Sequence, residues 1–204
     1  MVRRFGYTLI ELLIVIAILG TSGALLIPML GDRDDFDTQA AIRRLIADLT
    51  FAQSDALANQ EHRRLVFLPD TEQDGRFRGW CIVKLAESQL GAPFDANSAV
   101  YVQDPLAPSG TNGNYIADLY SDERFGKAFI ASVDLDGGAT AITYDELGGT
   151  VTSSGQPGTG GTIVVRGGGV AYEITIDGVT GKVSVADITN ATPELEVGGS
   201  VVGG

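Results

Sequence analysis

An uncharged, apolar stretch near the N-terminus constrains the fold of this chain more than any other feature. It runs from Leu12 to Leu30 and follows a short basic start that contains Arg3 and Arg4. As a helix rising about 1.5 Å per residue, these 19 residues span roughly 28 Å, close to the thickness of a bilayer core. We therefore expect residues 7–30 to form a transmembrane helix, with the two arginines holding the N-terminus on the cytoplasmic side.

A carboxylate at the head of this stretch separates two interpretations of it. An ordinary secretory signal peptide also has a basic start and an apolar core, and residues 21–24 offer it a weak cleavage site. Such a peptide has no use for Glu11, because a carboxylate placed deep in a bilayer without a partner costs on the order of 3 kcal/mol. We therefore expect Glu11 to be kept for a positively charged partner.

The segment from Arg3 to Gly20 closely resembles the class III signal of type IV pilins and pseudopilins. The resemblance implies cleavage by prepilin peptidase after Gly6, N-methylation of the new N-terminal Tyr7, and pairing of the Tyr7 amine with Glu11 during assembly. Phenylalanine is usual where Tyr7 stands, and proline is common at the position of Pro28. Residues four apart share a helix face, which brings amine and carboxylate together. Pro28 lacks an N–H and is expected to kink the helix.

A second helical pattern follows the polar cluster at residues 32–35. Apolar residues recur there at the spacing of one helix face. They are Ile42, Leu45, Leu49, Ala52 and Ala56. We expect a helix from about Asp37 to about Ala58, continuous with the apolar segment, within an amphipathic stretch of residues 31–60. Arg44, Asp48 and Asp55 are expected to lie away from the apolar face.

Beyond residue 61 the pattern changes to short β-branched and aromatic runs separated by turns. We expect strands at residues 64–68, 79–85, 139–144, 162–166, 171–176 and 182–185. Gly167-Gly168-Gly169 suits a hairpin turn, and residues 177–181 suit the next one. Residues 86–128 are expected to be mostly loop. The only cysteine, Cys81, lies beside Trp80 and is expected to be buried in a strand.

These patterns predict an α+β fold in which a long N-terminal helix packs on an antiparallel sheet. The expected organisation is a cleaved leader at residues 1–6, a globular β-rich domain at residues 61–189 and a flexible tail at residues 190–204.

Two later segments are similar to the GspH/FimT-type minor pseudopilins. Leu49–Ala56 resembles the end of their long helix, where arginine often stands at the position of Gln53 and glutamate at that of Asp55. Residues 147–186 resemble their C-terminal hairpin. Some FimT-type proteins bind DNA through an arginine-bearing turn, but the turn here contains only Lys182.

Other candidate sites are weak. Residues 70–75 resemble the start of a calcium loop, but the twelfth position is Cys81 rather than glutamate. Residues 134–137 are similarly weak, and His62 is the only histidine and suggests a polar helix end rather than a triad or metal site. The glycine runs lack the Lys-Ser/Thr of a phosphate loop. The net charge of −12 also argues against nucleic-acid binding as the function, because such binding relies on Lys and Arg contacts to phosphates.

The resemblance implies a minor pseudopilin of a type II secretion system, without enzymatic activity or a cofactor. Its partners are then prepilin peptidase, membrane lipid, the inner-membrane assembly platform and other pilin or pseudopilin subunits. The domain is expected in the periplasm, first anchored to the inner membrane and then in a filament. A minor pilin of a type IV pilus, serving adhesion, motility or DNA uptake, is the alternative. A membrane-anchored binding or enzymatic domain that uses a pilin leader is the alternative of another class.

Overall fold

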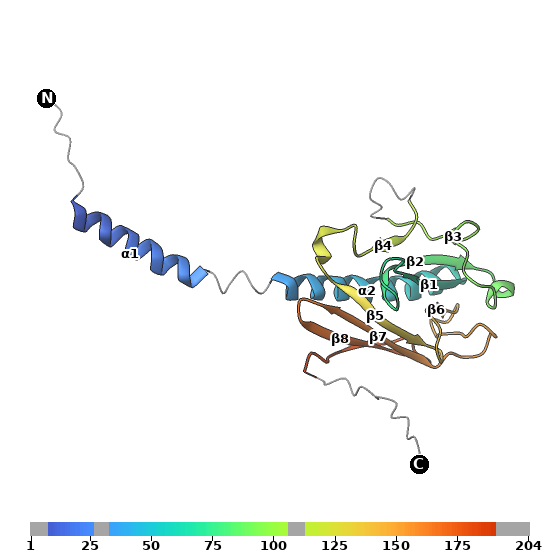
Figure 1. Cartoon of the computed structure of the whole chain (residues 1–204). Coiled ribbons are helices and arrows are strands. Elements are labelled where there is room, and N and C mark those ends of the chain that lie inside the picture. The colour runs from blue at the N-terminus through green and yellow to red at the C-terminus, as the bar shows by residue number, and fades with distance from the viewer. Residues whose placement is uncertain (1–7, 27–32, 106–112, 191–204) are drawn as a thin grey trace, which may run out of the picture.

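The computed structural model describes residues 8–26, 33–105 and 113–190. Two helices precede a sheet domain (Figure 1). The helices are α1 (Leu9–Leu26) and α2 (Arg33–Asn59), and two 3-10 turns are η2 (Glu87–Gln89) and η3 (Glu123–Phe125). The strands are β1 (His62–Pro69), β2 (Phe77–Leu85), β3 (Val100–Tyr101), β4 (Ile116–Asp118), β5 (Phe129–Leu135), β6 (Ala141–Tyr144), β7 (Gly160–Gly167), β8 (Val170–Asp177) and β9 (Val183–Asp187).

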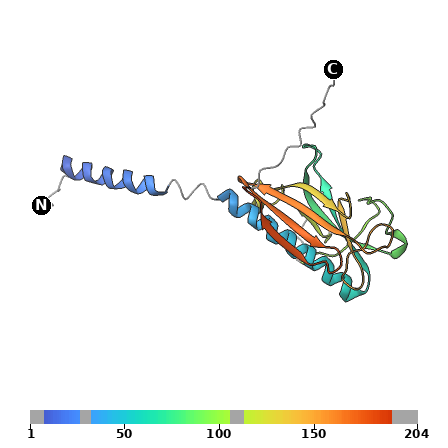
Figure 2. The ribbon, with the colours of Figure 1, turned by 90° about the horizontal axis from the view of Figure 1, so that it is seen from below.

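All pairings between these strands are antiparallel, in the order β6-β1-β2-β5-β7-β8-β9, and β3 and β4 also pair with β2. Helix α2 lies along one face of the sheet, as Figure 2 shows from below. The predicted α+β class, with a helix packed on an antiparallel sheet, is confirmed. The expected continuity of the two helices depends on residues 27–32, which lie outside the described part of the chain. Of the tail expected at residues 190–204, residues 191–204 also lie outside it.

The core forms between α2 and this face of the sheet. The apolar helix face predicted from the sequence is buried throughout, from Ile42 at 5% exposure to Ala56 at 0%. It packs against Leu65, Trp80 and Ile163 of the strands. Since α2 is amphipathic and its face is covered by these side chains, burial of apolar surface is what fixes the helix on the sheet.

Strands β1 and β2 are also covered on their opposite face. Side chains alternate along a strand, and Val66, Cys81 and Val83 point away from α2 into a second small cluster. The loop after β2 closes this cluster with Phe94. Cys81 is 1% exposed in β2, which confirms its expected burial.

The predicted strands all form, and both glycine-rich turns lie where expected. Residues 167–169 connect β7 to β8, with Gly168 and Gly169 at φ values of 59° and 88° that favour glycine. Residues 86–128 contain mainly irregular chain with β3, β4 and two 3-10 turns, except that residues 106–112 lie outside the described part.

Strand β5 was not predicted. Its register with β7 shifts between Ile130 and Ser132, which marks a bulge. A bulge inserts one extra residue, so the alternation of apolar and polar side chains is broken within the strand. The interpretation of His62 as part of a polar helix end is wrong, because His62 begins β1 and is 8% exposed.

Candidate functional site

The described part of the α1 surface, residues 9–22, is mostly apolar. Its large aliphatic side chains, between Leu9 and Leu19, range from 48% exposed at Val15 to 81% exposed at Leu9. A soluble surface helix instead shows one apolar stripe and one polar face. An apolar surface of this extent marks a segment that is covered by lipid or by other protein chains.

Helix α1 lies within the span expected to cross the membrane, from residue 7 to residue 30. Within the described residues, no helix is both long enough and apolar enough to span a bilayer. Of the four predicted site residues, Glu11 lies in α1, whereas Gly6, Tyr7 and Pro28 lie outside the described part of the chain.

Glu11 takes part in the start of α1. The Glu11 N–H donates to the hydroxyl oxygen of Thr8 over 3.4 Å, and the Thr8 N–H donates to the Glu11 carboxylate over 3.5 Å. This reciprocal pattern is a capping box, which satisfies two backbone donors at a helix N-terminus, here through long bonds. Sequence reasoning missed the role of Thr8, although the Thr-x-x-Glu spacing signals it.

The capping box has a consequence for the pairing expected of Glu11. The carboxylate turns back towards the N-terminal end of α1, where the positive end of the helix dipole also favours it. Glu11 is exposed, so the same oxygens are open to a partner cation. A cation arriving there would meet a carboxylate that is already oriented.

A buried polar cluster fixes α2 to the sheet. The Asp48 carboxylate accepts hydrogen bonds of 2.8 Å from the Trp80 indole N–H and 2.8 Å from the Tyr115 hydroxyl. Arg44 pairs with the same carboxylate at 2.9 Å. Burial raises the pKa of Asp48 above its ordinary value, while Arg44 and the two neutral donors act to lower it.

The expectation that Asp48 lies away from the apolar face is therefore wrong. Asp48 is three residues after Leu45 and four before Ala52, so it falls on the same buried stripe. Asp48 is 2% exposed. Its two neutral hydrogen-bond donors are Trp80 in β2 and Tyr115, which directly precedes β4. Asp55 is also engaged, because it pairs with Arg63 of β1, which is 1% exposed.

Gln53 joins the two segments that carry the sequence resemblance. Its side-chain N–H donates 2.7 Å to the carbonyl oxygen of Gly148 and 2.8 Å to that of Thr180. The first carbonyl lies after β6 and the second lies in the turn between β8 and β9. A Cβ at Gly181 would lie 2.6 Å from the Gln53 amide, so the turn approaches α2 closely. Helix end and C-terminal hairpin thus form one packed unit.

The acidic turns have structural partners of their own. Asp70 accepts the Tyr120 hydroxyl at 2.7 Å and the Glu72 N–H at 2.9 Å. Asp136 accepts the backbone N–H groups of Thr159 and Gly160. Among the described residues, no group of three or more histidine, cysteine or acidic side chains is placed to hold a metal ion.

Comparison with known proteins gives one family match. Residues 1–27 match the family described as the prokaryotic N-terminal methylation motif. No curated protein matches the chain.

Two solved structures are similar to the chain, both of the type IV minor pilin FimU from Pseudomonas aeruginosa in different crystal forms. The first has 16% identity and a TM-score of 0.45, covering 76% of this chain and 92% of the other. The second has 16% identity and a TM-score of 0.44, covering 76% and 97%. Likeness at this level assigns no function. The N-terminal segment of this chain, residues 1–27, carries the prokaryotic N-terminal methylation motif.

Proposed function

We propose that this chain is a minor subunit of a pilin-like filament. The leader at residues 1–6 is cut off after Gly6, and Tyr7 becomes the methylated N-terminus. The apolar helix then anchors the subunit in the inner membrane, with the sheet domain in the periplasm. From there the subunit enters a filament through its assembly platform.

One observation supports this proposal most: α1 exposes aliphatic side chains together with a single carboxylate, that of Glu11. The large aliphatic side chains of α1 between Leu9 and Leu19 are exposed, and they include Ile10 at 69% and Leu19 at 65%. Burial of such surface against lipid, and later against other helices, supplies the driving force for membrane anchoring and assembly. The methylation motif at residues 1–27 supports the same reading.

Glu11 is the proposed specificity element of assembly. A carboxylate is expensive in an apolar environment unless a cation and hydrogen-bond donors compensate it. The amine of Tyr7 on an incoming or neighbouring subunit supplies both. Mispositioned subunits would leave the carboxylate without that amine, so the pair selects one register.

Of the machines that use such subunits, we propose the pseudopilus of a type II secretion system. The resemblance of residues 49–56 and 147–186 to GspH/FimT-type pseudopilins supports it. A minor pilin of a type IV pilus is the alternative. Deletion of the gene discriminates between them, because loss of protein export with intact pili supports the first and loss of pilus functions supports the second.

The proposal is tested by replacing Glu11 with alanine in the full chain. The Glu11→Ala variant should be cleaved and methylated normally but lost from the cross-linked filament fraction. Thr21→Val is a matched control on the same helix, because the Thr21 hydroxyl donates to the carbonyl oxygens of Ala17 and Ile18 in that helix. Normal incorporation of Glu11→Ala would contradict the proposal. A domain that is fully active without assembling would favour an anchored binding or enzymatic protein instead.

A further inference from the structure

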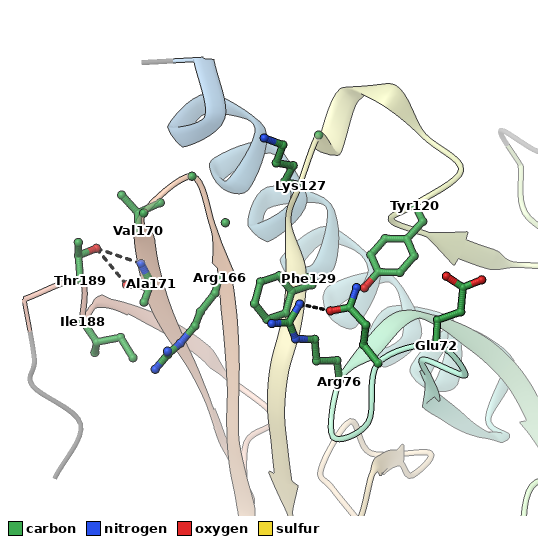
Figure 3. A pocket seen from close by; sticks show the side chains of 15 residues that line it. Glu72, Arg76, Tyr120, Lys127, Phe129, Arg166, Val170, Ala171, Ile188 and Thr189 are labelled. Carbon is green, nitrogen blue, oxygen red and sulfur yellow. Dashed lines mark hydrogen bonds between the residues drawn. The ribbon is translucent and has the colours of Figure 1, made fainter. Parts of the chain in front are cut away.

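The cations of the sheet domain are compensated either by carboxylates or by water. Four arginines form ion pairs, namely Arg44, Arg63, Arg78 and Arg124. Lys127 and Arg166, which line the groove of about 830 Å³ shown in Figure 3, form none among the described residues, but both are exposed to solvent. Either arrangement avoids the high free-energy cost of an isolated buried charge.

Arg64 of β1 has neither kind of compensation. It is 9% exposed, and within the described part of the chain no carboxylate pairs with it. Its Nε–H donates over 3.0 Å to the Thr143 hydroxyl, and its terminal nitrogens donate over 2.9 Å to the carbonyl oxygen of Ala92 and to that of Leu90. Burial lowers the pKa of Arg64 below its ordinary value. Neutral acceptors therefore satisfy part of the guanidinium and leave its charge without a counter-ion.

A cavity of about 360 Å³ lies beside this arginine, and we call it the Arg64 pocket. Its lining includes Val66 and Ala141, which pair with each other in β1 and β6. Both belong to the small apolar cluster on the side of the sheet opposite α2. The other lining residues come mainly from three loop segments, residues 90–94, 139–140 and 151–153. The pocket is therefore separate from the core between helix and sheet, and from the groove in Figure 3.

The polar groups of the Arg64 pocket leave room for an acceptor from outside. The Thr143 hydroxyl accepts from Arg64, and among the described residues no acceptor takes its own proton. Asp136 is the only carboxylate among the described lining residues. Its oxygen already accepts the backbone N–H groups of Thr159 at 2.7 Å and Gly160 at 3.2 Å. A largely apolar cavity with a few convergent donors is the usual form of a small-ligand site.

We propose that the Arg64 pocket binds a carboxylate attached to an apolar group. A carboxylate carries the single negative charge that one guanidinium lacks, and its two oxygens accept the N–H groups that remain. The Thr143 hydroxyl supplies a further donor, and the apolar group packs against Val66 and Phe94 of the lining. A phosphate dianion would bring more charge than one cation compensates. A small carboxylic acid and the C-terminus of a peptide with an apolar last residue both carry this chemistry.

Binding is measured on the full-length chain in detergent by saturation-transfer NMR, with N-acetyl-leucine and its uncharged amide as probes. The acid should bind with a Kd of about 1 mM or below, and the amide about tenfold or more weakly. Arg64→Gln should weaken binding of the acid about tenfold or more. Arg166→Gln removes the same charge at an exposed position outside the pocket and should bind like the wild type. Trp80 fluorescence shows that each variant is folded.

A second pair of variants tests the missing counter-ion without changing Arg64, which also holds the loop at residues 90–92. In the register of β1 and β6, Arg64 pairs with Thr143 and Val66 with Ala141. Ala141 is therefore a diagonal neighbour of Arg64 on the same face, about 7 Å away. Ala141→Glu should bring a carboxylate to the guanidinium and exclude the acid. Its midpoint of thermal unfolding should exceed that of Ala141→Gln, which fills the same space without charge, by about 3 °C or more.

A pentapeptide that ends in leucine distinguishes the two sources of the carboxylate. If the pocket takes peptide C-termini, the free-acid peptide should bind more tightly than N-acetyl-leucine, because the preceding residues add contacts at the loops. If it takes small acids, N-acetyl-leucine should bind more tightly, because the longer chain does not fit. In both cases the C-terminally amidated peptide should bind about tenfold or more weakly than the free acid.

Three results would overturn the pocket: an acid that binds no better than its amide, equal binding by Arg64→Gln and Arg166→Gln, or equal unfolding midpoints for Ala141→Glu and Ala141→Gln. The last result would show that the neutral partners of Arg64 compensate its charge fully. None of these results bears on leader cleavage or on entry into a filament. The pocket and the proposed function are therefore tested independently.

Discussion

Asp48, in the middle of α2, accepts a 2.8 Å hydrogen bond from the indole N–H of Trp80 in β2. Both residues are buried, at 2% and 0% exposure. The contact links α2 to β2, an interior strand of the sheet. It is therefore one of the buried polar ties between the helix and the sheet.

Replacing Asp48 by alanine should destabilise the domain strongly. The change leaves the Trp80 N–H and the Tyr115 hydroxyl buried without an acceptor, which costs about 2–4 kcal/mol of the free energy of unfolding. Asp48→Asn retains one acceptor oxygen and should cost less. Urea unfolding of the full chain in detergent, followed by Trp80 fluorescence, measures both. Asp134→Ala, at an exposed position, is the control; equal midpoints for it and Asp48→Ala would contradict the role of the cluster.

Cys81 should be almost unreactive in the folded chain. Burial raises the pKa of its thiol from an ordinary value of 9.0 to about 12. Alkylation at pH 8 should therefore be slow in buffer and fast in urea, since the thiolate is the reactive form. Because the folded pKa is the higher one, the free energy of unfolding should fall as pH rises from about 9 towards 12. Equal alkylation rates with and without urea would show that the thiol is exposed.

Removing the Gln53 amide should loosen the C-terminal hairpin. Gln53→Ala deletes the bonds to the carbonyls of Gly148 and Thr180, which together contribute about 1–2 kcal/mol. Amide hydrogen exchange should become faster in the β8–β9 turn, while β1 and β2 stay protected. Ser54→Ala, exposed on the next position of α2, should leave exchange unchanged. Uniformly faster exchange throughout would indicate general destabilisation rather than a local tie.

A methyl group at Gly79 should disrupt the pairing of β2 with β4. A Cβ there would lie 2.0 Å from the backbone oxygen of Ala117, which cannot be relieved by a side-chain rotation. Gly79→Ala should therefore lower the free energy of unfolding by more than about 2 kcal/mol. Gly91→Ala provides a comparison, because its Cβ would only approach Ser153 oxygen at 3.3 Å. Similar urea midpoints for the two variants would contradict the close approach.

Most of the fold follows from periodicity. The apolar stripe of α2 and the predicted strands form because their patterns match a covered helix face and paired strands. The helical spacing does place Asp48 on the buried stripe, but the burial of its carboxylate could not be expected without its donor Trp80 in β2. The burial of Arg63 likewise depends on Asp55, which lies on another element. Strand β5 was missed because its bulge breaks the period of two.

The candidate site was predictable in part. Glu11 stands out because charge is expensive in an apolar run, and Thr8 could have been found from its spacing to Glu11.

The most direct test is the mass of the mature N-terminus, measured on membranes from cells with and without prepilin peptidase. We predict a chain that begins at N-methylated Tyr7 when the peptidase is present and retains residues 1–6 when it is absent. A chain that keeps Met1 in both cells, or that is cut near Ala24, would contradict assignment to the pilin pathway.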